Sequence, residues 1–400
     1  MDSLFPRPIF TAFGPTALRP ERAAQPSSKV KASRPDRLRI QVKRGCPRVP
    51  GIYGMVDRRG ELIYVGKAKC LRTRLLSYFR LKSRDPKAGR IIRHTRTLLW
   101  EPSPSEFAAL LRELELIRCW QPRFNVQGQP RRRRRLYVCL GRSPAPYVYL
   151  SSHPAAKNGA SFGPVPARDE AREAVRRLND CFALRDCPQS QKMIFADQKE
   201  LFPLVRSAGC LRYEIGTCLG PCAGACTKGS YEKRVRAARH FLSGQDESIL
   251  SSLRSDMATA SARQAFERAA ALRDKLEALS WLRTQLHRIK HIRQHQSYIY
   301  PVCGIDGTEL WYVVHGGKVT AALPAPSNDT GRRALKSDVQ KRMPRKTSTE
   351  LSVPLDDLDG LLLVSSWFRR HPEERERLLD LKTLAPMSIS PTPITPSPAS

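Results

Sequence analysis

The chain has 400 residues, 40% of them hydrophobic, and 70 Lys and Arg against 37 Asp and Glu give it a formal net charge of +33. This length accommodates two or three domains with cores of their own. No apolar run reaches about eighteen residues, so the sequence predicts no transmembrane helix. The positive charge favours sequence-independent binding to nucleic-acid phosphates, although a ribosome-associated or simply basic soluble protein would share it.

The cysteines and the N-terminus bear on the cell compartment. Eleven cysteines, an odd number, occur without the continuous apolar segment of a signal peptide. This combination predicts a reducing compartment, in which cysteines are free thiols or metal ligands rather than disulfides. An organelle transit segment is an alternative reading of the N-terminal arginines and prolines.

The first third of the chain contains a basic arm and a folded module. Residues 1–44 are rich in Pro, Arg, Ala and Ser without a sustained period, which predicts a disordered basic arm. Apolar runs at 51–56 and 62–65 flank an Asp-Arg-Arg-Gly turn and predict a β-hairpin, followed by a basic amphipathic helix. Residues 105–120 predict a second helix, capped by Ser105 and ending at Gln121 before Pro122. We therefore expect one module over residues 46–126.

The remaining residues predict further elements of both types. After an arginine run, residues 136–140 and 147–150 have the pattern of strands, within a basic, cysteine-rich region at 127–227. Residues 228–292 are helical in pattern, broken at Gly244. Alternating residues and a Gly-Gly turn at 316–317 predict a hairpin in a small C-terminal α/β region, 293–383, before a disordered tail at 384–400. The expected fold class is α+β.

The hairpin module carries residues suited to phosphodiester hydrolysis. Tyr53 and Tyr64 lie on neighbouring predicted strands, and Lys67 and Arg74 follow them closely. A phenol with a pKa of about 10 is a poor base, so we expect these cations to favour the phenolate. Glu113, on the 105–120 helix, supplies the oxygen ligand that Mg²⁺ requires. Each residue alone would be ordinary packing or solvated surface, and only their joint occurrence favours a catalytic site.

These residues stand in five segments, PGIY, IYVGKAK, RLLSYF, ALLRELELI and QPRFNV, that resemble the GIY-YIG nuclease domain of the excinuclease subunit UvrC. The resemblance implies that Tyr64 is the general base, Glu113 the ligand of Mg²⁺ or Mn²⁺, and Arg74 the group that stabilises the transition state. The positions that it implies for orienting and polarising the reactants are Tyr53, Lys67, Tyr78 and Asn125. Glu115 and Trp120 depart from the family's usual Asn and Tyr.

Four cysteines between residues 187 and 222 form a set with irregular spacing. Zinc sites prefer paired short spacings, whereas iron–sulfur clusters tolerate irregular ones, and a set of reduced structural thiols remains open. The segment RYEIGTCLGPCAG resembles UvrC and implies a 4Fe–4S cluster. Cys181 and Cys226 are further candidates, and residues 189–208 are expected to be an inserted loop. The expected ligands are Cys187, Cys210, Cys218 and Cys222.

The helical segment 264–279 has apolar residues at i, i+3 and i+4 spacing and requires a partner helix. By default it is one arm of a helical hairpin in a core. It also resembles the UVR motif, which implies association with a UvrB-like helicase subunit through Phe266 and Arg273.

The resemblance is nearest to short UvrC homologues that keep only the N-terminal half, without the second nuclease. It implies a single incision, on the 3′ side, in damaged double-stranded DNA during nucleotide excision repair, in the bacterial cytoplasm at the nucleoid. The alternatives are a non-catalytic adaptor that binds DNA and the B subunit, and a GIY-YIG nuclease of a mobile-element or restriction lineage. Expected DNA contacts are Arg72, Arg131, Arg132, Arg133, Arg134 and Arg135.

Overall fold

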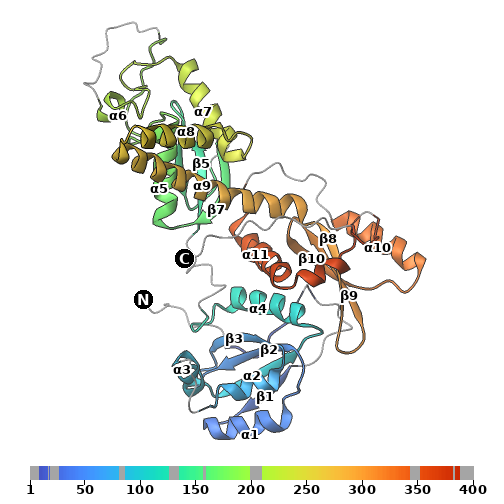
Figure 1. Cartoon of the computed structure of the whole chain (residues 1–400). Coiled ribbons are helices and arrows are strands. Elements are labelled where there is room, and N and C mark those ends of the chain that lie inside the picture. The colour runs from blue at the N-terminus through green and yellow to red at the C-terminus, as the bar shows by residue number, and fades with distance from the viewer. Residues whose placement is uncertain are drawn as a thin grey trace. The chain divides into compact units, whose positions relative to one another are not determined.

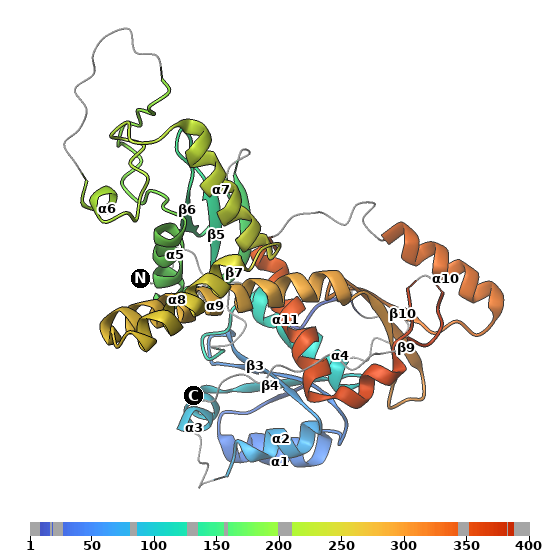
Figure 2. The ribbon, with the colours of Figure 1, turned by 45° about the horizontal axis from the view of Figure 1, so that its top comes forward.

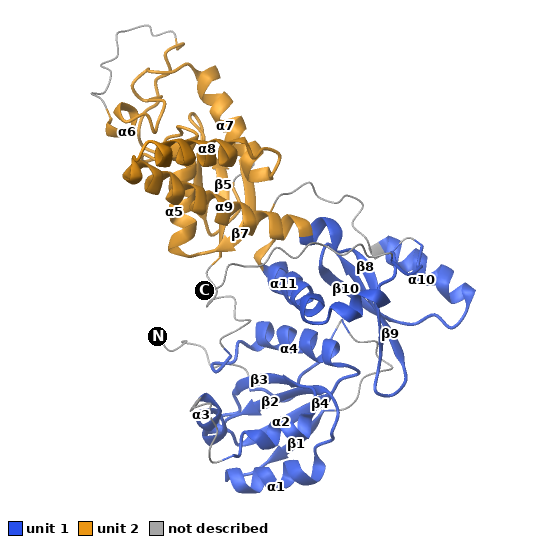
Figure 3. Cartoon of the chain, viewed as in Figure 1, with its two compact units in different colours: residues 1–132, 292–346, 356–400 blue, residues 133–291, 347–355 orange. Residues whose placement is uncertain are grey.

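The computed structural model (Figure 1) describes two compact units, each assembled from separate parts of the sequence (Figure 3). Unit 1 joins residues 1–132 with 292–346 and 356–400, and unit 2 joins 133–291 with 347–355. Within the ranges that the structure describes, every helix is too short or too polar to cross a membrane. The described residues are 9–16, 18, 27–80, 86–125, 135–155, 159–198, 210–342, 352–381 and 383–387.

Unit 1 begins with a four-stranded antiparallel sheet in the order β1-β4-β2-β3. The predicted hairpin is confirmed as β2 and β3, with Tyr53 opposite Gly66. A side chain at Gly66 would collide with the Tyr53 hydroxyl, so only glycine leaves room for that ring. The strands are β1 (Ser28–Lys31), β2 (Gly51–Val56), β3 (Leu62–Ala68) and β4 (Thr97–Pro102).

Four helices accompany this sheet: α1 (Pro35–Gly45), α2 (Leu71–Ser77), α3 (Pro86–His94) and α4 (Glu106–Trp120). The predicted ends of α4 are confirmed. The Ser105 hydroxyl accepts a hydrogen bond from the Ala108 N–H at 3.1 Å, and Gln121 ends the helix in a left-handed conformation with a φ of 45°.

The prediction of a disordered arm over residues 1–44 is wrong for most of the part that is described. Residues 28–31 form β1, which pairs with β4, and Leu38 and Val42 of α1 are fully buried. Phe10 and Phe13, each 4% exposed, pack in a core with Ile52 and Leu116. These apolar residues are too few and too irregular to form a period, so only their packing partners reveal them. Residues 1–8, 17 and 19–26 lie outside the described residues.

A three-stranded sheet, β10-β9-β8, forms the C-terminal part of unit 1. The predicted Gly-Gly turn is confirmed, since Gly316 and Gly317 have positive φ values of 55° and 80° between β9 and β10. One face packs on α4, where the Phe107 ring lies 5.1 Å from the rings of Tyr300 and Tyr312. The elements are β8 (Tyr298–Cys303), β9 (Glu309–His315), β10 (Lys318–Pro324), α10 (Asp329–Arg342), α11 (Leu355–Arg370) and the 3-10 helix η2 (Pro372–Arg377).

Unit 2 contains a sheet in the order β6-β5-β7 and the helices α5 to α8, together with most of α9. The strands predicted at residues 136–140 and 147–150 are confirmed as β5 and β6. Helices α8 and α9 form a hairpin and lie side by side in Figures 1 and 2. The two regions expected at 127–227 and 228–292 share one core, in which Phe162 and Leu178 join Phe241 and Leu282. The bounds are β5 (Arg135–Gly141), β6 (Tyr147–Ser151), β7 (Ala160–Pro166), α5 (Asp169–Cys181), α6 (Leu211–Glu214), α7 (Lys228–Ser243), α8 (Ser248–Ala262) and α9 (Phe266–His295).

Candidate active site

Three tyrosines from three elements of unit 1 converge on one point. Tyr53 of β2, Tyr64 of β3 and Tyr78 at the end of α2 have ring centres 6.0 to 6.2 Å apart. The hydroxyls of Tyr53 and Tyr78 are hydrogen-bonded at 2.9 Å. Tyr53 and Tyr78 are buried, whereas Tyr64 is half-buried. Tyr64 is therefore the phenol of the three that is most open to solvent.

Arg74 brings a positive charge to this cluster from an exposed position on α2. It lies one helical turn before Tyr78, so the two side chains share a face of the helix. Its Nε donates a hydrogen bond to the Tyr53 hydroxyl at 3.3 Å, and its guanidinium carbon lies 5.2 Å from the Tyr78 ring centre. The guanidinium thus contacts the phenols and remains open to a ligand.

Arg74 favours the phenolate form of all three tyrosines, as expected, but burial outweighs its effect. Burial raises the pKa of Tyr53, Tyr64 and Tyr78 above the ordinary value, and Arg74 only partly offsets it. The negative charge of Glu113 raises the pKa of Tyr64 further. Desolvation prevails because removing a phenolate from water costs more than one partly exposed guanidinium returns.

Glu113 reaches the tyrosine cluster from α4. Its Oε1 accepts a hydrogen bond from the Lys67 N–H of β3 at 3.1 Å. Burial raises the pKa of Glu113, with Lys67 and Arg74 acting in the opposite direction. A divalent cation would favour the ionised carboxylate, and carboxylate oxygen is the donor that Mg²⁺ prefers. The donor chemistry at Glu113 therefore fits such a cation.

The ammonium of Lys67 pairs with a carboxylate rather than with the phenols. Its ammonium donates to Glu106 Oε1 at 2.8 Å, and the Lys69 ammonium lies 3.1 Å from the other oxygen of that carboxylate. Burial opposes ionisation of Glu106, but the hydrogen bonds from Lys67 and Lys69 prevail and lower its pKa. Glu106 and Glu113 are seven residues apart and so lie on one face of α4. This spacing is the signal by which the sequence would have revealed Glu106.

Asn125 binds the backbone of β3 next to the candidate site. Sheet order makes β3 an edge strand. The side chain of Asn125, 6% exposed, accepts from the Val65 N–H at 2.9 Å and donates to the Val65 carbonyl at 2.8 Å. It thereby satisfies two backbone groups next to Tyr64 and Gly66. Asn125 thus acts on the strand that carries two of the predicted site residues, Tyr64 and Lys67.

The predicted DNA-contacting arginines are only partly visible. Arg72 donates through Nε to the Cys46 carbonyl, which ties α2 to the end of α1. Arg135 is half-buried at the start of β5. The other four, Arg131, Arg132, Arg133 and Arg134, lie outside the described residues.

The four predicted cysteine ligands of unit 2 line one pocket of about 100 Å³, together with Arg185 and Arg212. Burial raises the pKa of Cys187 and Cys218, and the Gly220 N–H lies 3.5 Å from the Cys218 sulfur as a donor. Across the described parts of the chain, however, no three His, Cys, Asp or Glu side chains form a metal-holding group. Cys181 is not among the pocket-lining residues, and the expected loop at 189–208 falls partly outside the description, at residues 199–208. The cysteines lining the pocket are Cys187, Cys210, Cys218 and Cys222.

The UVR-like segment divides into a packed part and an exposed part. Leu279 is fully buried in the core of unit 2, as expected for a helical hairpin. Phe266, at the start of α9, is 67% exposed. Arg273 is also exposed and lies 3.0 Å from Asp274. The hairpin thus presents an aromatic ring and a cation at its exposed end.

Three family models match this chain in succession. They are the UvrC-like GIY-YIG domain at residues 49–126, the UvrC/Cho excinuclease middle domain at 136–241 and the UvrB/uvrC motif at 247–280. Residues 49–280 form a UvrC-like excinuclease region. Its first part is a GIY-YIG endonuclease domain.

Curated relatives and solved structures are similar to this region. UvrABC system protein C of Histophilus somni (strain 2336) is 36% identical over 238 residues, covering 58% of this chain and 36% of the relative. The protein of the same name from Rhizobium meliloti is 31% identical, covering 70% and 38%. The GIY-YIG domain of UvrC from Thermotoga maritima, solved with its catalytic magnesium, is 32% identical and covers 23% of this chain and 98% of that domain, with a TM-score of 0.21. The chain spans less than two-fifths of the length of these two curated relatives.

Proposed function

We propose that this protein is a divalent-cation-dependent endonuclease that incises damaged double-stranded DNA in nucleotide excision repair. The observation that carries the proposal is the convergence of Tyr64, Arg74 and Glu113, which come from β3, α2 and α4, on one partly exposed point. A general base, a cation for the phosphate and a metal ligand are the three parts that phosphodiester hydrolysis requires.

Each side chain has a defined task in this proposal. Tyr64 Oη takes a proton from the attacking water, and the Arg74 guanidinium binds the negative charge that develops on the phosphate. Tyr53 and Tyr78, hydrogen-bonded to each other, hold Arg74 in place. Glu113 would hold Mg²⁺ or Mn²⁺, which supplies positive charge to the phosphate oxygens and lowers the pKa of neighbouring acids. With such a cation held by Glu113, the pKa of Tyr64 would fall from the value to which burial raises it.

The alternatives are less well supported. A non-catalytic adaptor needs none of the contacts among Tyr53, Arg74 and Tyr78. A mobile-element or restriction nuclease has no need of a UvrC middle domain and a UVR motif, both of which match here.

The proposed partners follow from charge and from the hairpin. The net charge of +33 favours DNA, and the exposed Phe266 and Arg273 suit a UvrB-like helicase subunit. By likeness to the bacterial relatives, the site of action would be the cytoplasm, at the nucleoid.

We also propose a 4Fe–4S cluster at the cysteine pocket, which supports the fold and takes no part in hydrolysis. Four thiols line one pocket, and thiolates are the donors that such clusters use, although these side chains do not stand as a metal-holding group among the described residues. An anaerobic preparation should be brown, and Cys218→Ser should remove the colour. A colourless preparation with stoichiometric zinc would replace the cluster by a zinc site.

Nicking of a lesion-containing duplex tests the main proposal. Wild type, Glu113→Gln and Arg74→Ala are compared in Mg²⁺, with and without the helicase subunit, and Glu170→Gln, exposed in unit 2, is the matched control. The first two variants should lose about a hundredfold or more in rate, whereas the control should cut like wild type. Mapping the nick tests the expectation of one incision on the 3′ side. Equal cutting by all four proteins would refute the assignment.

A further inference from the structure

An N-terminal segment, residues 9–16, lies against α4 and is here named the strap. The Phe10 N–H donates to the Gly60 carbonyl at 2.9 Å, and the Phe10 ring meets the Trp120 ring edge-on at 4.9 Å. Phe13 packs against Gly54 so closely that a side chain at Gly54 would collide with it. The strap therefore completes the core between α4 and the sheet rather than resting loosely on the surface.

Arg112 of α4 anchors the strap. Its side chain is 7% exposed, and a guanidinium so deprived of water requires partners for its N–H groups. It donates to the Phe13 carbonyl at 3.0 Å, to the Pro15 carbonyl at 3.1 Å and to the Gly14 carbonyl. Glu115 Oε2 accepts a further bond at 2.8 Å. Gly14 has a φ of +73°, a turn that lets three successive carbonyls face one cation.

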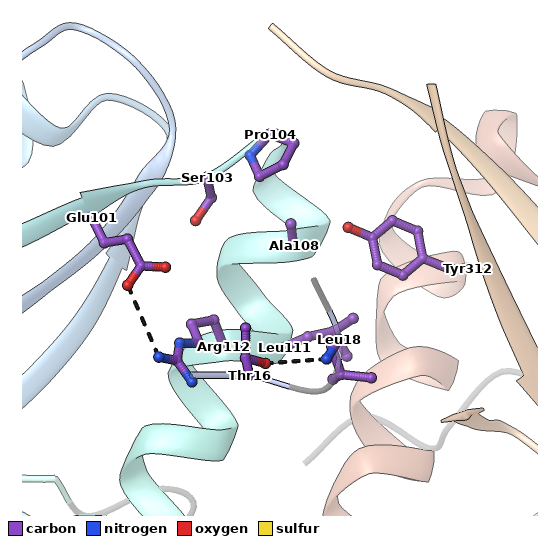
Figure 4. Close-up of a pocket in the computed structure, with 9 residues that line it drawn as sticks. All are labelled: Thr16, Leu18, Glu101, Ser103, Pro104, Ala108, Leu111, Arg112 and Tyr312. Atoms are coloured by element: carbon purple, nitrogen blue, oxygen red, sulfur yellow. Dashed lines mark hydrogen bonds and ion pairs between the residues drawn. The ribbon is translucent and has the colours of Figure 1, made fainter. Parts of the chain in front are cut away.

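The helix that carries Glu113 is thus held on three sides. Successive residues of a helix point about 100° apart around its axis. Glu113 faces β3, Arg112 faces the strap, and Phe107 and Leu111 face the C-terminal sheet. Figure 4 shows a small pocket on the strap side of α4, lined by Arg112 and Leu111 of α4, by Glu101 of β4 and by Tyr312 of β9.

We propose that the strap is a positioning element for the catalytic cation, with Arg112 as the positioning residue. Rotation of α4 about its axis would carry the Glu113 carboxylate away from the Lys67 N–H, and the strap opposes that rotation through the neighbouring residue. This inference rests on the proposed role of Glu113 and adds the segment that fixes its place.

Mn²⁺ binding to the full-length protein without DNA tests the inference. Loss of the strap contacts in Phe10→Ala/Phe13→Ala should weaken binding at the Glu113 site by about tenfold or more, as is typical when groups behind a metal ligand are removed. Phe10→Leu/Phe13→Leu keeps apolar volume and should restore most of the affinity. Ile9→Ala, at a strap residue that is 72% exposed, is the matched control and should bind like wild type.

A milder variant guards against misfolding. At Gly14 an added Cβ meets nothing within 4 Å, yet alanine disfavours the positive φ that aims the carbonyls at Arg112. Gly14→Ala should therefore weaken Mn²⁺ binding about threefold or more without creating a cavity. Unchanged Mn²⁺ affinity in both Gly14→Ala and the double alanine variant would reduce the strap to a stabilising segment and overturn the inference.

Glu113→Gln separates this inference from the proposed function. If it abolishes Mn²⁺ binding while wild type cuts no DNA, the nuclease proposal fails, and the strap is still judged by the affinities. If Glu113→Gln binds Mn²⁺ like wild type, the cation lies elsewhere and both proposals fall.

Discussion

Replacement of Asn125 by alanine separates a structural role from a chemical one in the candidate active site. The side chain pairs with both the N–H and the carbonyl of Val65, on the outer edge of β3. The residues on either side of Val65 are Tyr64 and Gly66, so a loosened edge would move the proposed base directly. We expect Asn125→Ala to destabilise β3 and to slow nicking as a consequence.

The magnitude follows from the two bonds. Each hydrogen bond contributes about 0.5–1.5 kcal/mol, and a buried group left unpaired costs about 1–3 kcal/mol. Asn125 is 6% exposed, so water replaces its bonds only in part. The expected loss is about 2–4 kcal/mol in the free energy of unfolding. Asn125→Asp keeps the acceptor for the Val65 N–H but sets an oxygen against the Val65 carbonyl, and should lose at least as much.

The chain offers a matched control in unit 2. Asn179, 2% exposed, accepts from the Val148 N–H at 3.1 Å and donates to the Val148 carbonyl at 2.8 Å. Asn179→Ala should therefore cost a similar amount in β6 but leave the rate of nicking within about twofold of wild type. Hydrogen exchange of residues 62–68 and 147–151 reports the two strands separately, which matters because two units need not unfold together.

One outcome would refute this reasoning. If Asn125→Ala leaves hydrogen exchange in β3 unchanged and yet abolishes nicking, Asn125 acts on the substrate and its pairing with Val65 is incidental.

Four further tests probe the remaining contacts. Glu106→Gln frees the ammonium of Lys67 and should slow nicking about tenfold with little change in stability. Lys69→Gln changes the more exposed partner of the same carboxylate and should alter the rate less than twofold. Equal effects of the two substitutions would count against a special role for Lys67. Because burial raises the pKa of Tyr64, the fraction of its phenolate form still increases over the range from about pH 7 to pH 9, and the wild-type rate of nicking in Mn²⁺ should rise with it. Tyr64→Phe should lose activity at every pH. A flat pH profile of the wild type would exclude Tyr64 as the base. Phe107→Ala removes the ring that packs against Tyr300 and Tyr312 and should lower the free energy of unfolding in denaturant by about 3–5 kcal/mol. A decrease below about 1 kcal/mol would contradict this packing. Phe266→Ala should abolish pull-down of the helicase subunit without changing stability, since that ring is exposed, and retained pull-down would remove Phe266 from the interface.

Several elements were predictable because their signals are local. The hairpin of β2 and β3 follows from two apolar runs around a turn, and α4 follows from a capping serine and a proline just beyond its end. Such signals act over a few residues, and the structure contains them where the sequence predicts them. The residue types of the candidate site, a phenol, a guanidinium and a carboxylate, were likewise visible in the sequence.

The partners of those residues were not predictable in the same way. Lys67 was expected to act on the phenols, but its ammonium lies against Glu106, 39 residues away. The pKa of Tyr64 was expected to fall, yet burial raises it, and no sequence pattern states how deeply a side chain is buried. Charge type is a local property, whereas desolvation depends on what the rest of the chain places around a group.

The sequence by itself determined the type of module, the strands and helix that carry the candidate site residues, and the resemblance to UvrC. Only the tertiary structure decided that residues 9–16 brace α4, through bonds between Arg112 and three carbonyls that lie 97 to 99 residues earlier. It also decided that a C-terminal sheet packs against Phe107 of the same helix. The physical reason is the distance along the sequence over which each property is set. Helix caps, turns and hydrophobic periods are set by residues close in the sequence, whereas the burial of a charge or a ring depends on segments that meet only when the chain folds.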